Sequence, residues 1–385
     1  MTESQKPSVL IIGGLGYLGR WLAYYLYTNN LASEIRIVDK HLPEFAWLAP
    51  EFEEACRNFV QADMSKEQSV KKVFEREGGA SFDFVFNCAG EMKYAQTEET
   101  YKVRNRDLPI LCAKEAASRG VRLFVELGDG RVYGDATKRK AESAELNPWL
   151  TMAKYKMEAE RELQKIEGLN LVILRIANAY GPYSSRTIST AICHARVNQY
   201  LKEDLDLLWT KDLKVSTVHI SDVSRAIWRA VQWYIGGKEN WSEEEWGKTP
   251  IFNIVDDGDT SQGKIAEILE GIFDIKIKFH GTIISQFATR SHESIEDILE
   301  EANKDVLQSW ADLMDQAGID IAGPITPFLE AEQVKYADLS LDGTKFKNVT
   351  GFQYEVPSIT SEKIKEMVES YRKMNWWPGQ SLLDE

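Results

Sequence analysis

Three glycines spaced three residues apart carry the clearest chemistry in the sequence. Gly13, Gly16 and Gly19 stand between a short apolar run at 9–13 and a stretch with helical spacing at 17–28. The first glycine permits a tight turn, the second lets backbone N–H groups approach a pyrophosphate, and the third lets the helix pack against the strand. Unpaired N–H groups at the start of that helix attract an anion. The pattern predicts a dinucleotide-binding loop, with a purely structural turn as the alternative.

Acidic residues close the next two strand candidates. Asp39 follows the glycine loop at the distance that the dinucleotide fingerprint requires. Its carboxylate would accept hydrogen bonds from the adenosine ribose and repel a 2′-phosphate, which favours NAD over NADP. Arg36 and Lys40 weaken that preference, and a solvated acid at a strand end is the alternative. Asp63 would meet the adenine amine, or serve as a plain loop acid.

A lysine and a glutamate four residues apart, Lys156 and Glu160, open a predicted helix. In the oxidoreductase class that the glycine loop suggests, a tyrosine precedes such a lysine by four residues, because positions four apart share one helix face. Met152 stands there instead, and a thioether cannot serve as a general base. Tyr155 points about 100° away from Lys156 around the helix. We interpret Tyr155 as a packed or half-exposed aromatic residue.

The apolar runs of the first 180 residues predict the strands that position these groups. They lie at 9–13, 35–39, 58–63, 82–90, 122–128 and 170–175. Continuous apolar strands that alternate with helical segments are typical of a parallel sheet covered on both faces. Right-handed crossovers then give an α/β fold with a doubly wound (Rossmann) sheet, whose ligand crevice lies at the C-terminal ends of the strands.

Beyond residue 180 this alternation loosens. Helices are expected at 190–201 and 294–318, a strand entering a helix at 215–234, and a further strand at 250–259. We predict a NAD-binding Rossmann domain at 1–180, with strands and helices returning from about 187–235. Residues 236–385 are predicted to form mainly a small C-terminal substrate-binding or cap lobe, interleaved with the Rossmann domain.

The composition excludes several classes of partner. A net charge of −14 argues against a nucleic acid or an anionic membrane surface as the main partner. No apolar run reaches the roughly eighteen residues of a membrane span, and the first residues are too polar for a signal peptide. The four cysteines lack paired spacing, which favours free buried thiols in a reducing, cytoplasmic setting over disulfides. The five histidines form no metal-binding pattern, so we predict no metal.

Several segments match a known family in order and spacing. They are "GGLGYLG" at 13–19, "NCAG" at 87–90, "VYG" at 132–134, "LRIANAYGP" at 174–182, "VHISDVSRAI" at 218–227 and "FNIVDDG" at 252–258. From about residue 9 to residue 352 the chain resembles the extended short-chain dehydrogenases/reductases, the NAD-dependent epimerase/dehydratase family. The resemblance implies a Rossmann fold and NAD as cofactor.

The resemblance also implies which residues bind the ligands. Asn105 falls on the asparagine of the family's central helix, and Lys156 on the lysine that binds the nicotinamide ribose. The implied cofactor-binding residues are Gly13, Gly16, Tyr17, Leu18, Asp39, Asp63, Met64, Cys88, Ala89, Gly90, Asn105 and Lys156. Asn178 matches a position that contacts the substrate near its phosphates, and Arg186 would supply positive charge there.

Two of the three catalytic groups of the family depart from its pattern. A serine or threonine, a tyrosine and a lysine surround the nicotinamide in that family, and here these positions hold Asp129, Met152 and Lys156. Some sugar-nucleotide dehydratases also carry methionine, and resemble one another in a Thr-Asp-Lys run at the end of the fifth strand. The corresponding stretch here is Asp129-Gly130-Arg131. Asp129 could act as the base if burial raised its pKa, or serve only as a turn residue.

Two functions therefore remain open. The first is an atypical epimerase, dehydratase or dehydrogenase that acts on a nucleotide-sugar-like or other hydroxylated small molecule, with Lys156 and Asp129 as its remaining catalytic groups. The second is a catalytically degenerate relative that uses bound NAD as a structural or sensing ligand. A homodimer is possible in either case.

Overall fold

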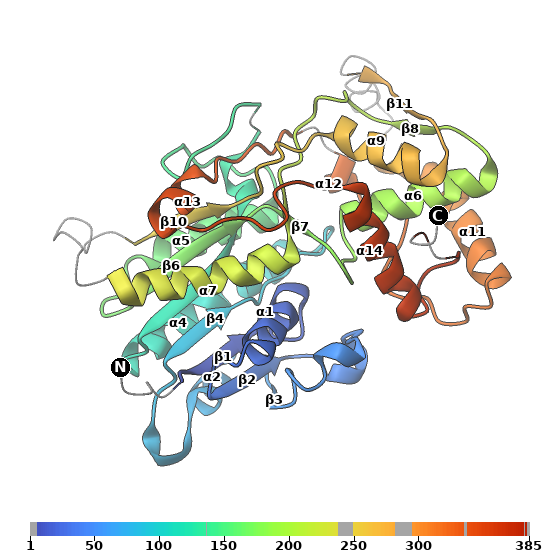
Figure 1. The fold of residues 1–385 in the computed structure, drawn as a ribbon. Coiled ribbons are helices and arrows are strands. Elements are labelled where there is room, and N and C mark those ends of the chain that lie inside the picture. Colours follow the sequence, from blue (N-terminus) through green and yellow to red (C-terminus); the bar gives the residue numbers. More distant parts are fainter. Residues whose placement is uncertain are drawn as a thin grey trace.

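Seven parallel strands form the central sheet, in the order β10-β6-β5-β4-β1-β2-β3 (Figure 1). The computed structural model describes residues 6–135, 137–237, 249–281, 295–334, 337–380 and 382. The strands are β1 (Ser8–Ile12), β2 (Glu34–Asp39), β3 (Phe59–Gln61), β4 (Phe84–Asn87), β5 (Leu123–Asp129), β6 (Leu171–Ile176) and β10 (Ile251–Ile254). The strand order reverses between β1 and β4, so the ligand crevice of such a sheet belongs at the carboxyl ends of these two strands.

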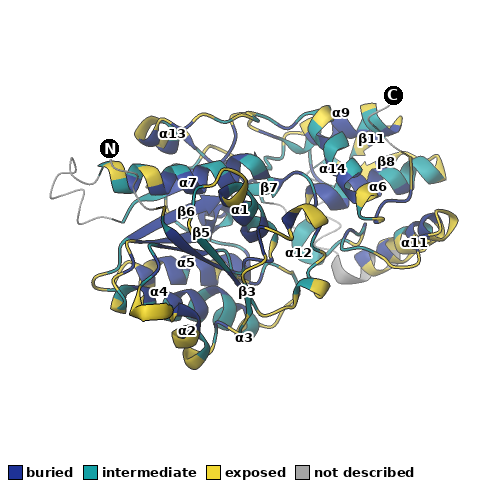
Figure 2. Ribbon diagram, turned by 60° about the horizontal axis from the view of Figure 1, so that its bottom comes forward, coloured by how far each residue is buried: buried dark blue, intermediate teal, exposed yellow. Residues whose placement is uncertain are grey.

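The central strands are buried along their whole length, as their apolar sequences predict. Every residue of β1, β5 and β6 is buried. Successive side chains of β1 enter different apolar clusters: Val9 and Ile11 belong to one, Leu10 and Ile12 to the other. A strand that is apolar on both sides requires a cover on both faces of its sheet, and Figure 2 shows the buried sheet between helices.

Helices supply that cover on both faces. Over the sheet, α1 (Tyr17–Thr28) and α7 (Ile220–Gly237) contribute to the first cluster, and α2 (Glu67–Phe74), α4 (Leu108–Ser118) and the end of α5 (Thr151–Leu163) contribute to the second. Each presents its buried residues to the sheet and its polar residues to solvent. The predicted doubly wound α/β fold is confirmed.

A smaller lobe lies at one end of the sheet (Figure 1). Its elements are α6 (Ile188–Leu201), β8 (Leu205–Leu207), α9 (Gln262–Phe273), β11 (Ile277–Phe279), α11 (Ile295–Gln316), α12 (Ala331–Val334) and α14 (Ser361–Lys373). β8 and β11 form a two-stranded parallel sheet, as do β7 (Asn178–Tyr180) and β9 (Thr217–His219). The helices expected at 190–201 and 294–318 correspond to α6 and α11.

The chain passes more than once between sheet and lobe. Helix α6, from the segment 187–235, packs against α9 and α11 of the lobe. Strand β10, from the segment 236–385, pairs with β6 in the central sheet, and α13 (Thr344–Thr350) packs beside it. The interleaving of the two predicted segments is thus extensive, and residues 238–248 and 282–294 lie outside the described part of the chain.

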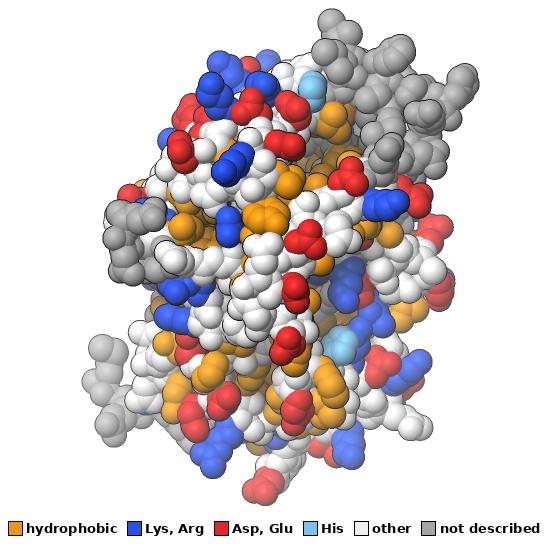
Figure 3. Space-filling model, turned by 90° about the vertical axis from the view of Figure 1, so that its right-hand side faces the viewer, with side chains coloured by type: hydrophobic (Ala, Val, Ile, Leu, Met, Phe, Trp, Pro, Cys, Tyr) orange, Lys and Arg blue, Asp and Glu red, His pale blue; other side chains and the backbone are white. Residues whose placement is uncertain are grey.

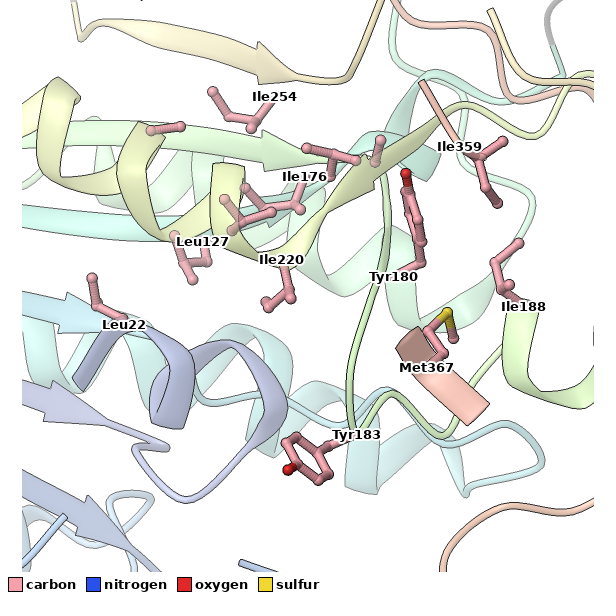
Figure 4. Packing of buried hydrophobic residues seen from close by; sticks show 14 of the residues in the cluster. Leu22, Leu127, Ile176, Tyr180, Tyr183, Ile188, Ile220, Ile254, Ile359 and Met367 are labelled. Atoms are coloured by element: carbon pink, nitrogen blue, oxygen red, sulfur yellow. The ribbon is translucent and has the colours of Figure 1, made fainter. Parts of the chain in front are cut away.

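One apolar cluster extends from the sheet into the lobe (Figure 4). Leu127 of β5 and Ile176 of β6 share this cluster with Ile188 of α6 and Met367 of α14. Since the core is continuous, the lobe is packed against the carboxyl end of the sheet.

On the lobe-side surface, acidic and basic side chains are interspersed (Figure 3). Among the described residues no helix is long and apolar enough to cross a membrane. The four cysteines are unpaired, and Cys56, Cys112 and Cys193 are buried. Burial raises the pKa of the Cys56 thiol to about 11, despite the opposing charge of Arg20, so this thiol is protonated at neutral pH.

Candidate active site

The glycine loop joins β1 to α1 in a tight turn. Gly13 has a φ of +71°, and a Cβ at this position would lie 2.6 Å from the backbone of Ala89. A Cβ at Gly19 would lie 2.4 Å from the carbonyl oxygen of Gly13. Side chains at these two positions would separate α1 from β1 and from the loop after β4, so both glycines are required for packing.

Gly16 differs, because it faces an open cavity. A Cβ here would meet within 4 Å only the carbonyl oxygen of Gly13, at 3.1 Å. Gly16 is the N-cap of α1, and no side chain caps it. The first N–H groups of α1 therefore point toward the cavity without an acceptor from the helix. This arrangement fits the pyrophosphate of a dinucleotide.

Two adjoining cavities form a cleft at the carboxyl ends of β1, β4, β5 and β6. The outer cavity has a volume of about 480 Å³ and the inner cavity about 250 Å³. Gly16, Cys88, Ala89, Gly90 and Arg186 line both cavities. The outer cavity is also lined by Gly13, Asp39, Asp63 and Met64, and the inner cavity by Tyr17, Leu18, Asp129, Lys156 and Asn178.

Two carboxylates lie at the far end of the outer cavity. Asp39 accepts hydrogen bonds from the backbone N–H groups of Leu15, at 3.3 Å, and His41, at 3.1 Å. Asp63 accepts two from Ser65, at 2.7 and 3.0 Å. Burial alone would raise the pKa of Asp63, but these bonds and nearby positive charges hold that pKa below its usual value. Both groups can accept hydrogen bonds from ribose hydroxyls or a base amine.

The basic residues near Asp39 are in different positions. Arg36 donates to the carbonyl oxygens of Val73 and Glu75, at 2.9 and 2.7 Å, and does not line the outer cavity. Lys40 lines that cavity. Of the two cations that weakened the NAD preference, only Lys40 therefore faces the ligand space.

Lys156 projects from α5 into the inner cavity. Its Nζ donates to the carbonyl oxygen of Leu127, at 2.8 Å, and to Glu126 Oε1, at 3.3 Å. The other oxygen of Glu126 accepts a bond of 2.6 Å from Asn87. Burial raises the pKa of Glu126, while Lys156 and Asn87 oppose that rise. An ammonium has three N–H donors, so Lys156 keeps one for a ligand.

Asp129 and Arg131 form a bidentate ion pair at the end of β5. Arg131 Nη2 lies 2.8 Å from Asp129 Oδ2, and Arg131 Nε lies 2.9 Å from Oδ1. Oδ1 also accepts from the Arg131 backbone N–H. Burial alone would lower the pKa of Arg131, but Asp129 and the Tyr94 oxygen raise it. Asp129 thus caps the turn that follows β5, and its carboxylate is already engaged with Arg131.

Met152 lies one helical turn before Lys156 but outside the cleft. Its side chain is 1% exposed and packs in an apolar cluster with Tyr101, Leu150 and Tyr155. It lines neither cavity. The hydroxyl of Tyr155 donates to Glu98, at 2.8 Å, on the outer side of α5. Within the described residues, α5 therefore presents no phenol to the inner cavity.

Asn105 also lies behind the cleft rather than in its wall. It occurs in a π-helical turn, Lys102–Asp107, between α3 (Glu98–Tyr101) and α4. Its side chain bonds both the N–H and the carbonyl of Glu91, at 2.6 and 2.9 Å, and reaches the carbonyl oxygen of Met152 at 3.4 Å. It therefore connects the loop after β4 to α5.

The predicted substrate residues lie on the lobe side of the inner cavity. The amide of Asn178 donates to the carbonyl oxygens of Val215 and Ser216, at 3.2 and 3.3 Å. Arg186, just before α6, donates to the carbonyl oxygen of Met92. Arg186 lines both cavities, so its charge is available at their junction.

Glu126 and Tyr94 have prominent places here that the sequence did not reveal. Glu126 interrupts an apolar strand, and that is a signal for a buried charge with a partner. Tyr94 lines the inner cavity from the loop after β4, where no motif distinguishes it. Arg131 was visible in the sequence only as a departure from the Thr-Asp-Lys pattern.

The family model described as "NAD dependent epimerase/dehydratase family" matches residues 9–242. The chain belongs to this family. NAD is therefore the cofactor. The glycine loop, Asp39, Asp63 and Lys156 line the cleft described above. None of the curated protein sequences matches the chain.

Solved structures of the same fold cover nearly the whole chain. The Bordetella bronchiseptica enzyme WbmG, solved with NAD and UDP, is 15% identical, with a TM-score of 0.67 and 98% of each chain covered. The dTDP-glucose 4,6-dehydratase of Bacillus anthracis, solved with NAD, is 15% identical, with a TM-score of 0.65 over 96% of this chain and 98% of that one. The ADP-L-glycero-D-manno-heptose-6-epimerase of Helicobacter pylori is 17% identical, with a TM-score of 0.58 over 71% and 85% of the two chains.

Proposed function

We propose that the protein is an NAD-dependent enzyme that modifies the sugar of a nucleotide sugar. The observation that carries this proposal is the inner cavity, which adjoins the dinucleotide cleft and is lined by Lys156, Arg131 and Arg186. Cations around a cavity of about 250 Å³ suit a substrate that has both phosphates and a hydroxylated ring. Two similar structures support the same substrate class: WbmG was solved with NAD and UDP, and the other is a dTDP-glucose 4,6-dehydratase solved with NAD.

Different residues of the cleft would bind different parts of NAD and of the substrate. The N-terminus of α1 at Gly16 would hold the pyrophosphate of NAD, and Asp39 the adenosine ribose, which favours NAD over NADP. Lys156 would give its remaining donor to the nicotinamide ribose. Arg186 and Asn178 would meet the substrate near its phosphates. Bound NAD supplies a hydride acceptor, and the protein must supply the matching proton acceptor.

Lys156 owes its position to a buried ion pair. The pair with Glu126 and the bond to Leu127 hold the ammonium at the wall of the inner cavity. An ammonium so fixed favours negative charge on a neighbouring oxygen without reorganising when that charge develops. This is the role of the lysine in an epimerase, dehydratase or dehydrogenase alike.

The test is turnover of a panel of UDP-, dTDP- and ADP-sugars by the NAD-loaded protein, with products identified by mass and NMR spectra. Lys156→Met should reduce turnover by about 10²-fold or more, since a fixed charge of this kind typically contributes that much. Lys154→Met is the matched control, because Lys154 is on the same helix but half exposed, and pairs with Glu98. No conversion of any substrate by wild-type protein with NAD bound would contradict the proposal.

A second candidate is a binding protein that holds NAD without chemistry. It is favoured by the burial of Met152 and by the ion pair that engages Asp129. This candidate predicts that the protein binds NAD tightly and converts no sugar of the panel. It also predicts that the conservative change Lys156→Arg leaves both the NAD affinity and the lack of turnover unchanged. A homodimer and a cytoplasmic location remain proposals that size measurement and cell fractionation would test.

A further inference from the structure

The inner cavity contains a phenol that does not come from helix α5. Tyr94 lines this cavity together with Gly90, Asp129, Arg131 and Lys156. It is half-buried, and its ring packs at the edge of the apolar cluster that holds Met152. A phenol and a lysine therefore line the same cavity, even though the residue four positions before the lysine on α5 is a methionine.

The hydroxyl of Tyr94 accepts one hydrogen bond and keeps its own proton for another acceptor. Arg131 Nη1 donates to the Tyr94 oxygen at 3.1 Å. Because the guanidinium has only donors, the phenol oxygen accepts in this contact and its own proton is directed elsewhere. Among the described residues the Tyr94 hydroxyl donates to no protein acceptor.

The loop that carries Tyr94 is held on three sides. The hydroxyl of Tyr101 donates to the carbonyl oxygen of Lys93 at 2.7 Å, and the N–H of Ala95 donates to Glu332 of α12 at 2.8 Å. Arg186 donates to the carbonyl oxygen of Met92. The residues on both sides of Tyr94 are thus fixed, which is the support that a catalytic side chain on a loop requires.

We propose that Tyr94 is the general acid/base of this enzyme, with Arg131 as the residue that positions its hydroxyl through the hydrogen bond to the phenol oxygen. This inference rests on the proposed function. In the step assigned to Tyr94, the O–H bond of a substrate hydroxyl breaks and an O–H bond forms on the phenolate oxygen. The negative charge passes from Tyr94 to the substrate oxygen, beside the ammonium of Lys156. In the reverse direction Tyr94 returns the proton.

The first experiment compares Tyr94→Phe with Tyr155→Phe, each loaded with NAD and given the UDP-, dTDP- and ADP-sugar panel. General-base catalysis typically contributes about 10²–10⁴-fold, so Tyr94→Phe should lose that much in kcat while its NAD affinity is unchanged. Tyr155→Phe removes a phenol from the same apolar cluster, outside the cavity, and should retain the wild-type kcat. Full turnover by Tyr94→Phe would overturn the proposal.

The second experiment needs no turnover and separates this proposal from the proposed function. Tetranitromethane nitrates phenolates, and peptide mass spectra give the extent at each tyrosine of the NAD-loaded protein. Tyr94 should be nitrated faster than Tyr155, whose pKa is raised to about 12 by its hydrogen bond to Glu98. UDP should slow nitration of Tyr94, because it would fill the inner cavity that Tyr94 lines, whereas nitration of the exposed Tyr27 should not change.

The outcomes are distinct. Equal nitration of Tyr94 with and without UDP would overturn the assignment of Tyr94 to the reacting sugar even if the protein turns over a sugar nucleotide. Absence of turnover in wild type, with Tyr94 still protected by UDP, would reject the sugars of the panel as substrates and support the assignment of Tyr94.

Discussion

Replacing Gly16 by valine should abolish NAD binding while the fold is retained. Gly16 has a φ of −65° and a ψ of 168°, an extended conformation that valine adopts readily. A Cβ there would meet only the Gly13 carbonyl oxygen, at 3.1 Å, a tight contact that a shift of a few tenths of an ångström would relieve. The side chain would instead project into the space at the N-terminus of α1, where the pyrophosphate belongs.

The expected loss follows from the hydrogen bonds that the pyrophosphate would forfeit. If two N–H donors of α1 lose a charged acceptor, at about 1.5–3 kcal/mol each, the binding free energy falls by roughly 3–6 kcal/mol. At about 1.4 kcal/mol for each tenfold change, NAD affinity should fall by about 10²–10⁴-fold.

Isothermal titration with NAD measures the affinity, and thermal unfolding without ligand measures the fold. The matched control is Gly271→Val in α9, where a Cβ has no neighbour within 4 Å; it should bind NAD like the wild type. Gly19→Val should instead unfold the protein, because its Cβ would lie 2.4 Å from the Gly13 oxygen. Undiminished NAD affinity in Gly16→Val would refute the assignment of the pyrophosphate to this loop.

Three further predictions concern the cofactor preference, helix α5 and the buried carboxyl group of Asp256, which follows β10. Asp39→Ser should narrow the gap between NAD and NADP affinities, because it removes the carboxylate that repels a 2′-phosphate; tighter binding of NADP than NAD by the wild type in parallel titrations would reject this. Met152→Tyr should cost roughly 1–3 kcal/mol of stability in urea unfolding, since the added bulk enters a packed cluster, and a large gain in turnover would contradict the role given to Tyr94. Burial raises the pKa of Asp256 to about 7, so protonation favours the folded state, and its contribution to stability should decline as the pH rises from about 4 to about 7. Asp256→Asn should flatten this decline in unfolding measured across that range, and an unchanged slope would show that Asp256 does not titrate there.

The sequence predicted most of what local patterns determine. Apolar runs identified the strands of the sheet, because a strand buried on both faces needs continuous Val, Ile and Leu. The three glycines predicted the tight turn between β1 and α1, since each spacing requirement acts within a few residues. Lys156 lines the inner cavity, and its position relative to Met152 follows from spacing within a single helix.

Contacts between distant segments were not predictable in this way. The placement of Tyr94 depends on hydrogen bonds of its neighbours: Arg186 donates to Met92, 94 positions away, and Ala95 donates to Glu332, 237 positions away. The ion pair of Lys156 with Glu126 joins α5 to β5, and the sequence gives no sign that these two residues are close in space. The burial of Met152 in a cluster with Tyr101 likewise depends on the packing of three segments, which the spacing of residues does not reveal.

The most direct test of the central claim is a crystal structure of the protein with NAD and UDP. The account predicts the NAD pyrophosphate at Gly16, the nicotinamide in the inner cavity beside Lys156, and the UDP phosphates near Arg186. The Tyr94 hydroxyl should face the space between the nicotinamide and UDP, where the sugar would lie. A nicotinamide outside the inner cavity, or UDP bound away from Arg186 and Tyr94, would contradict it.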